Sequence, residues 1–251
     1  SAMKKLGFAD VVEVAIGADL CATQEASDFI AEVPEKLPFM GTSCCPAWSV
    51  MAKKTFPEYA ECISMALTPM VLTARLIKKD HPNAKVVFIG PCAAKKLEAK
   101  RKSVRSEVDF VLTFEEMDGI FDARHVDLEN IEEDPNGVND ASTDGRNFAV
   151  SGGVAKAVVN VIKDRYPDRE VKVTGAEGLR ECRKMLQDAV AGKYPGYLLE
   201  GMACPGGCVA GAGTMQAIKK SQTMVGLYAK QAGHKIASQT EHIKELDKLV
   251  D

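Results

Sequence analysis

The eight cysteines are the side chains of this sequence whose type and spacing most clearly indicate chemistry. Cys44 and Cys45 are adjacent, Cys92 follows a Gly-Pro pair, and Cys204 and Cys208 are separated by three residues. Four thiolates are enough to hold a zinc ion or an iron–sulfur cluster. Zinc sites with four sulfurs usually come from two CxxC pairs, whereas these thiols lie on three distant segments. This spacing favours a larger cluster, with widely separated corners, over a single ion.

Not every cysteine is expected to bind a cluster. Cys21, Cys62 and Cys182 stand alone, and isolated free cysteines are usually small buried packing residues. Adjacent cysteines do not easily bind one metal together, because their side chains diverge, so the pair at 44–45 leaves one spare thiol. A thiol with a pKa of about 8.5 can exchange protons near neutrality, or it can simply pack in the core.

Residues beside the cysteines add two further signals. Lys95 and Lys96 follow closely after Cys92, and a lysine near an anionic cofactor would be a charge-assisted donor; the alternative is a pair of surface lysines. Gly206 and Gly207 lack side chains where the backbone would have to pass close to a bulky cofactor.

The elements that would position these residues alternate between strand and helix, which predicts an α/β fold with a mainly parallel sheet. Cys92 and Cys204 directly follow expected strands, and the pair at 44–45 follows the short apolar run Phe39-Met40. Ligands of open α/β sheets bind beyond the carboxyl ends of the strands, so these three loops are expected to converge. Hydrophobic periodicity predicts strands at 11–16, 85–89, 110–112, 148–150, 170–173 and 196–199 and helices at 24–33, 66–79, 154–163 and 177–186. The acidic stretch 128–146, which includes Pro135-Asn136-Gly137, is expected to be a solvated loop.

Composition restricts the class of protein. The chain has 251 residues, 46% hydrophobic and 27% charged, with a net charge of −3, which indicates a globular protein and excludes a disordered one. Dispersed charges predict no nucleic-acid partner. No apolar run reaches the roughly 18 residues of a membrane span and no signal peptide opens the sequence, so a cytoplasmic location is expected. Residues 1–3 are expected to be a tag remnant.

Three segments carry a family resemblance: 42–48 (TSCCPAW), 91–98 (PCAAKKLE) and 202–209 (MACPGGCV). In this order they resemble the three signature motifs of the iron-iron (FeFe) hydrogenase catalytic domain, and 109–113 and 151–154 are also similar to that family. The resemblance runs from Leu6 onward. It implies two lobes with mainly parallel, twisted sheets flanked by helices and a cofactor between the lobes. It also implies that residues 4–251 form the H-cluster domain without the family's first strand and helix.

The resemblance implies a specific cofactor, the H-cluster, in which a 4Fe–4S cubane is bridged to a diiron subcluster carrying CO, cyanide and a dithiolate amine. Lys95 would contact a cyanide, and Cys44 would pass protons to the bridging amine. Met202 and Thr68-Pro69 would line the diiron pocket. The cubane ligands would be Cys45, Cys92, Cys204 and Cys208, of which Cys208 forms the bridge.

A proton relay is also implied by the resemblance. Ser64 lies at the same distance after Cys44 as the family's relay serine. Glu25 and Asp28 correspond to two acidic relay residues, and their spacing places them on one helix face. Glu32 stands where the family often has an arginine.

The implied activity is reversible reduction of protons to dihydrogen, with a ferredoxin-like donor or a cluster domain supplying electrons and maturation proteins supplying the diiron unit. Several departures from the family pattern resemble its divergent sensory branch, which makes a low-turnover hydrogen sensor one alternative. Another is a non-enzymatic iron–sulfur assembly protein of the prelamin-recognition type, although such relatives usually have a single cysteine in the first motif. A zinc-stabilised domain is the third. The departures are Ala47, Gly90, Ala212 and Thr214.

Overall fold

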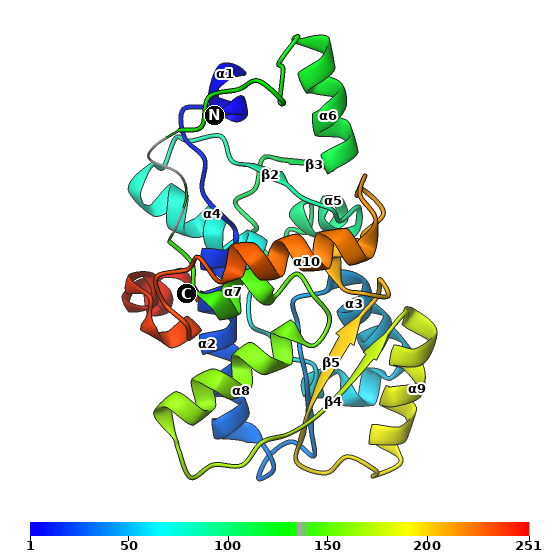
Figure 1. The fold of residues 1–251 in the computed structure, drawn as a ribbon. Coiled ribbons are helices and arrows are strands. Elements are labelled where there is room, and N and C mark those ends of the chain that lie inside the picture. The colour runs from blue at the N-terminus through cyan, green and yellow to red at the C-terminus, as the bar shows by residue number, and fades with distance from the viewer. Residues whose placement is uncertain (135–137, 139, 251) are drawn as a thin grey trace.

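A computed structural model of the chain describes residues 1–134, 138 and 140–250, and its elements form two lobes joined by helices (Figure 1). One lobe contains a three-stranded parallel sheet with the order β1-β5-β4. The other contains a two-stranded parallel sheet, β2-β3. The strands are β1 (Met40–Gly41), β2 (Val87–Ile89), β3 (Phe110–Leu112), β4 (Lys172–Glu177) and β5 (Tyr197–Met202).

Helices cover both sheets, as expected for parallel strands. In the three-stranded lobe the strands contact α3 (Pro46–Thr55), α8 (Gly153–Arg165) and α9 (Leu179–Val190). The smaller sheet carries α5 (Ala94–Ala99) and α6 (Phe114–Ala123), the latter started by a capping box between Thr113 and Glu116. The prediction of an α/β fold with parallel sheets flanked by helices is confirmed.

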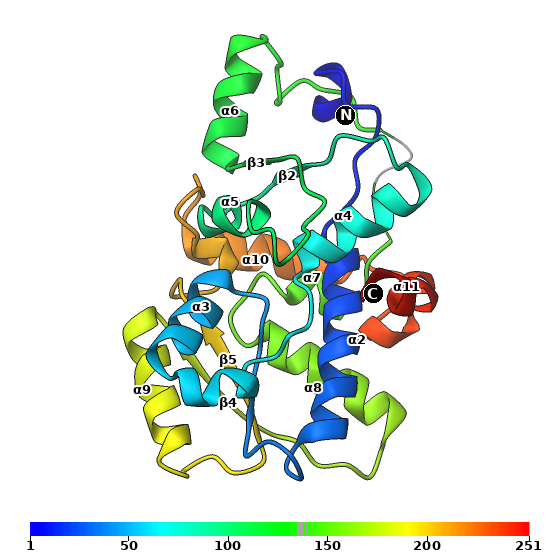
Figure 2. The same ribbon diagram turned by 180° about the vertical axis from the view of Figure 1, so that it is seen from behind.

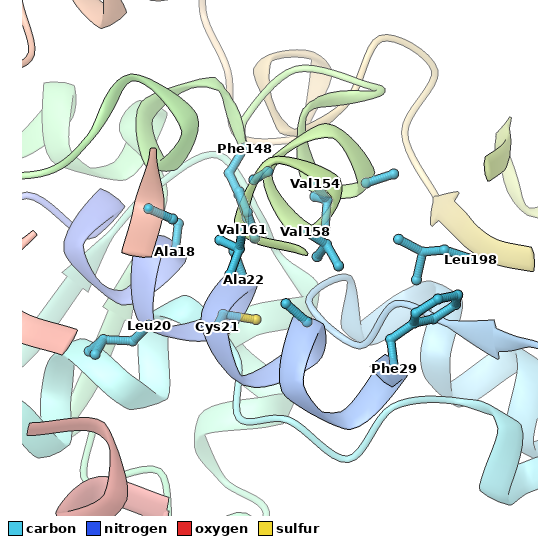
Figure 3. Packing of buried hydrophobic residues seen from close by; sticks show 14 of the residues in the cluster. Ala18, Leu20, Cys21, Ala22, Phe29, Phe148, Val154, Val158, Val161 and Leu198 are labelled. Atoms are coloured by element: carbon cyan, nitrogen blue, oxygen red, sulfur yellow. The ribbon is translucent and has the colours of Figure 1, made fainter. Parts of the chain in front are cut away.

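Helix α2 (Ala15–Glu32) runs through the centre of the molecule (Figure 2). It packs against α4 (Pro69–Asp80), α7 (Thr143–Asn147) and α8. Gly17 permits the contact with α4, because a Cβ at this position would lie 2.1 Å from the Pro69 carbonyl oxygen. Leu20, Phe29 and Val158 belong to the large apolar core between these helices (Figure 3).

The remaining elements lie at the periphery. Helix α10 (Ile218–Ala229) crosses between the two lobes in Figure 1, and the last residues pack beside α2 and α4. Among the described residues, no helix combines the length and apolar character that crossing a bilayer requires. Besides α10 (Ile218–Ala229), the peripheral elements are α1 (Ala2–Lys5), α11 (Leu246–Val250) and the 3-10 helices Pro57–Cys62, Cys208–Ala210, Ala237–Gln239 and Glu241–Glu245.

Three sequence-based expectations about local structure are wrong. Residues 11–14 form no strand, and the expected strand 11–16 overlaps the start of α2, because its β-branched run has no neighbouring strand to pair with. Residues 148–150 are not a strand either: Phe148 ends α7 and packs in the core, and a turn leads into α8. The stretch 128–146 is only partly a solvated loop, because Asp144 and Arg146 are buried on α7; its residues 135–137 and 139 lie outside the described part.

Candidate cluster-binding site

The loops that carry Cys45 and Cys204 leave the same edge of the larger sheet. Strands β1 and β5 are parallel neighbours, so the segments that follow them emerge together. The Thr42 amide donates to the Leu199 carbonyl at 2.9 Å, which continues this pairing. Trp48 of α3 packs directly on β5, since a Cβ on Gly201 would lie 2.2 Å from its ring. The indole nitrogen of Trp48 donates to the Thr42 carbonyl at 3.0 Å and locks the loop between β1 and α3.

The Cys92 loop is joined to the segment after Cys208. Gly213 donates its amide to the Pro91 carbonyl at 3.0 Å. Gly211 lies so close to the same peptide that a Cβ would be 2.4 Å from the Pro91 carbonyl oxygen. Any side chain at Gly211 would push the two loops apart. The sequence-based expectation that three strand-end loops approach one another therefore agrees with these contacts.

Electrostatic interactions among the thiols indicate that they lie near one another. Burial raises the pKa of Cys208 to about 12, and the neighbouring thiols of Cys45, Cys92 and Cys204 add to the shift. Within the described residues, however, no three His, Cys, Asp or Glu side chains form a ready-made site for one metal ion. The four sulfurs thus affect one another without being gathered around a single point.

The surroundings of these thiols suit an anionic iron–sulfur cluster. Cys45 is the N-cap residue of α3, with Pro46 in the first helical turn, so the positive end of the helix dipole favours negative charge there. A buried lysine, Lys95, adds a cation near Cys208, where it opposes the rise in the pKa of that thiol. Thiolates are the ligands that a 4Fe–4S cluster requires, and the helix N-terminus and the buried cation favour its negative charge.

Lys95 is buried and held in position by two contacts. Its Nζ forms an ion pair with Glu98 Oε2 at 2.6 Å and donates to the Cys44 carbonyl at 3.3 Å. Burial alone would lower the pKa of Lys95, but the Glu98 carboxylate and then the thiols of Cys44 and Cys92 raise it above its usual value. The ammonium therefore keeps its charge beside the cysteine loops.

Cys44 lies beside a buried carboxylic acid. Glu25 Oε1 accepts hydrogen bonds from the Ser43 amide at 2.6 Å and the Ser43 hydroxyl at 2.8 Å. Burial raises the pKa of Glu25 to about 7, against the opposing effect of the hydrogen bonds from Ser43 and Ser64. Burial, followed by the negative charge of Glu25, raises the pKa of Cys44 well above its usual value. At neutral pH the thiol is protonated and the acid is close to half-ionised.

The two remaining residues of the expected proton relay, Ser64 and Asp28, differ in how they are placed relative to Glu25. Ser64 approaches Glu25 and its hydroxyl accepts from the Ala66 amide at 3.1 Å. Asp28 lies about one turn further along α2, half-buried, and accepts from the Gln24 side chain at 2.7 Å. No hydrogen bond recorded for the described residues joins Asp28 to Glu25.

The residues expected to line the diiron pocket are mostly buried. Met202 ends β5 and is buried, and Thr68 and Pro69 begin α4. The Thr68 hydroxyl is buried without a hydrogen-bond partner among the described residues. It is a free polar group at the position that the resemblance assigns to the pocket wall.

Three neighbours of this site were not singled out from the sequence. Glu98 pairs with Lys95, and the i,i+3 spacing on a helix would have indicated the pair. Ser43 bridges Glu25 and the Ala66 carbonyl. Cys21 is buried, as expected of a packing cysteine, but its position one turn before Glu25 also brings it near Cys44.

A cavity of about 1270 Å³ lies elsewhere, lined by the segment 8–14, α4 and β2, and none of the cysteines lines it. Its walls are mainly apolar, with Asp80, His81 and His242 among the polar lining residues, and they hold no thiol for a cluster.

Comparison with known proteins identifies the family. A family model described as the C-terminal domain of the iron-only hydrogenase large subunit matches residues 1–212, which is most of the chain. The chain belongs to the iron-only hydrogenase family. All of its motif cysteines, the last of which is Cys208, lie within the matched residues.

Curated relatives of this iron-only hydrogenase family member include enzymes and an assembly factor. The periplasmic Fe hydrogenase large subunit of Nitratidesulfovibrio vulgaris is 30% identical over 260 residues, covering 85% of this chain and 61% of the relative. Iron hydrogenase 1 of Clostridium pasteurianum is 27% identical over 287 residues, covering 98% of this chain and 50% of the relative. Cytosolic iron-sulfur assembly component 3 of Mus musculus is 26% identical over 269 residues, covering 86% and 56%. The chain thus spans between half and 61% of these relatives' lengths.

Solved structures show the same fold. A FeFe-hydrogenase from Chlamydomonas reinhardtii matches with a TM-score of 0.75 at 23% identity, covering 98% of this chain and 81% of that one. A second FeFe-hydrogenase structure, from work on oxygen inactivation of the H cluster, matches with a TM-score of 0.77 at 23% identity and the same coverage. The lobes and sheets described above are therefore those of the FeFe-hydrogenase fold.

Proposed function

We propose that this chain binds an H-cluster and catalyses the reversible conversion of protons and electrons to dihydrogen. Cys45, Cys92, Cys204 and Cys208 hold the 4Fe–4S cubane in this proposal, and Cys208 also bridges to the diiron unit. The observation that carries it is the spare thiol of Cys44, which stays protonated next to the buried acid Glu25, while the Cys44 carbonyl accepts a hydrogen bond from the buried Lys95 ammonium. When bound, the cluster supplies electrons and the iron at which dihydrogen forms or splits.

Lys95 binds the diiron unit through its ammonium. Its charge is maintained by Glu98, and a buried cation near the cluster would attract the anionic cyanide of the cofactor. Met202, Thr68 and Pro69 form apolar and hydroxyl-bearing walls that exclude bulk water and orient the unit. The unpaired Thr68 hydroxyl is available to donate a hydrogen bond there.

Cys44 and Glu25 transfer protons between the cofactor and the protein surface. A protonated thiol can give a proton to the cofactor, and an acid with a pKa of about 7 can resupply it at neutral pH. From Glu25 the route continues through Ser64 toward Asp28, whose half-buried position lies nearer the surface.

Electrons enter through the cubane from a ferredoxin-like donor or a further cluster domain, and maturation proteins deliver the diiron unit. We expect this chemistry in the cytoplasm. The chain spans about half the length of the curated relatives it matches, so the electron donor and the maturation proteins are proposed partners.

Two alternatives have specific support. The assembly-component relatives at 25–26% identity favour a non-enzymatic iron–sulfur protein, against which the paired Cys44 and Cys45 argue. A hydrogen-sensing role is favoured by Gly90, which stands where many catalytic members of the family that the sequence resembles have a methionine. The Phe88 ring lies close by, 2.7 Å from where a Cβ on Gly90 would be. A sensor would load the same cofactor and turn over slowly.

Reconstitution separates these functions. Anaerobic loading with iron and sulfide should give a cubane detectable by electron paramagnetic resonance after reduction, and serine at any of the four ligand cysteines should diminish it. Maturation with the diiron unit followed by a hydrogen-evolution assay with reduced viologen then distinguishes the enzyme from the slow sensor. A loaded cubane that accepts no diiron unit would favour the assembly protein.

A further inference from the structure

The loop between Cys204 and Cys208 has an unusual backbone, closed by a hydrogen bond from the Gly207 amide to the Cys204 carbonyl at 3.0 Å and held further by residues outside it. Gly206 and Gly207 have φ angles of +100° and +90°, which residues with a side chain rarely adopt. A Cβ on Gly207 would lie 2.6 Å from the Ser151 amide nitrogen, so the loop passes directly against the turn before α8. Only backbone groups of this loop are available to fix the spacing of its two thiols.

The Gly206 amide is held by a carboxylate from β4. Glu177 Oε2 accepts its hydrogen bond at 2.7 Å. Glu177 is the last residue of β4 and is in register with Met202 of β5, two residues before Cys204. The Gly178 amide also donates to the Met202 carbonyl at 2.8 Å. Sheet pairing therefore fixes where the Glu177 backbone lies relative to the start of the cysteine loop.

The carbonyl of Gly206 is held from the opposite side. It accepts from the Ser151 amide at 3.3 Å. The turn that carries Ser151 is itself bound by a buried carboxylate, because Glu200 accepts from the Gly152 amide at 2.5 Å and the Ala155 amide at 2.7 Å. Both backbone groups of Gly206 are thus bound. Its amide donates to the exposed Glu177 carboxylate, and its carbonyl accepts from the turn at Ser151, which the buried Glu200 carboxylate holds in place.

We propose that Glu177 is a positioning residue for the cluster: by accepting the Gly206 hydrogen bond it sets the spacing of the Cys204 and Cys208 sulfurs. The inference rests on the proposed binding of a cubane by these cysteines. Groups that orient metal ligands from outside typically change metal affinity strongly when they are removed. Glu177 is exposed, so solvent screens its charge and the hydrogen bond, rather than the charge, carries the effect.

The test compares three variants of the reconstituted protein. Glu177→Ala removes the acceptor, Glu177→Gln keeps an acceptor without the charge, and Glu181→Ala removes a nearby exposed acid on α9 as the control. The readouts are iron and sulfide content and the rate at which a chelator bleaches the cluster absorbance. Glu177→Ala should lose its cluster about tenfold faster than wild type, and the other two should remain close to wild type.

A Glu177→Ala cluster that is as durable as that of wild type would overturn the inference, and so would equal losses in the alanine and glutamine variants. If wild type itself takes up no cubane, the proposed function fails and this inference fails with it. Amide hydrogen exchange of residues 203–208 in the cofactor-free protein gives an independent reading. Exchange should be faster in Glu177→Ala than in Glu177→Gln, and equal protection in both would contradict the role.

Discussion

Replacing Glu98 by glutamine should reveal how strongly the buried ion pair determines the state of Lys95. The pair has a 2.6 Å separation, and only 10% of the Lys95 and 5% of the Glu98 side chain is exposed. With an effective dielectric constant of about 20, unit charges at this separation attract by about 6 kcal/mol. The cost of removing both charges from water offsets part of this attraction. Breaking such a pair by removing one partner is expected to lower the free energy of unfolding by about 3–5 kcal/mol.

The assay is anaerobic urea unfolding of the cofactor-free protein with the thiols kept reduced. The variant's deficit should shrink as the pH rises, because without Glu98 burial lowers the pKa of Lys95 and a neutral amine needs no counter-ion. Adding Lys95→Met to Glu98→Gln should recover about 2 kcal/mol, since no unpaired charge is left buried.

A matched control is the ion pair between Lys193 and Asp188, which has the same 2.6 Å separation but side chains that are 61% and 27% exposed. Its disruption by Asp188→Asn should leave the unfolding curve almost unchanged. The reasoning would be refuted if Glu98→Gln were no more destabilising than Asp188→Asn, or if the double variant were less stable than Glu98→Gln.

Two further predictions concern protons. Cys44→Ala should retain the cubane signal and lose most hydrogen evolution, because it removes the thiol next to Glu25 without removing a cluster ligand; wild-type turnover would exclude Cys44 from the proton route. Asp19→Asn should flatten the pH dependence of unfolding. Burial raises the pKa of Asp19 from 3.8 to about 7, so its contribution to stability is full at low pH and is lost as the pH rises through that value. Between about pH 5 and pH 8 wild type should lose about 3 kcal/mol more than the variant, and parallel curves would show that Asp19 does not titrate in this range.

The parts of the site that follow strands could be predicted from the sequence. Cys92 follows the β-branched run at 85–89, and Cys204 follows the apolar segment at 196–199. Such runs between helices predict parallel strands whose carboxyl ends share an edge. The α/β class followed from the same alternation. Strand β3 was placed at 110–112 with the observed bounds because its short apolar run is bounded by polar residues.

The sequence-based predictions of local structure are wrong where contacts between distant residues override the local hydrophobic pattern. Three of the residues 11–14 are valines, but they find no strand to pair with, and Glu13 between them binds the Arg146 guanidinium at 2.9 Å. That contact and the bonds from Ser142 to Asp19 draw α7 onto α2, which buries part of an acidic stretch expected to be solvated. Ion pairs between residues more than a hundred positions apart leave no mark in sequence periodicity.

The position of the Glu177 carboxylate could not be foreseen for a related reason. Its partner is a backbone amide rather than a side chain, and the contact depends on the register between β4 and β5. The sequence predicted a strand at 170–173 and a helix at 177–186, so Glu177 was assigned to the start of the helix, whereas it is the last residue of β4. Lys95 and Glu98 differ, because their spacing within one helix already implies contact.

Infrared absorption of the protein after maturation with the diiron unit tests the central claim most directly. Iron-bound CO and cyanide absorb where no protein group does, so the account predicts these bands in wild type and their loss when Cys208 is replaced by serine. A protein that carries the cubane but shows no such bands under conditions that mature a known hydrogenase would contradict it.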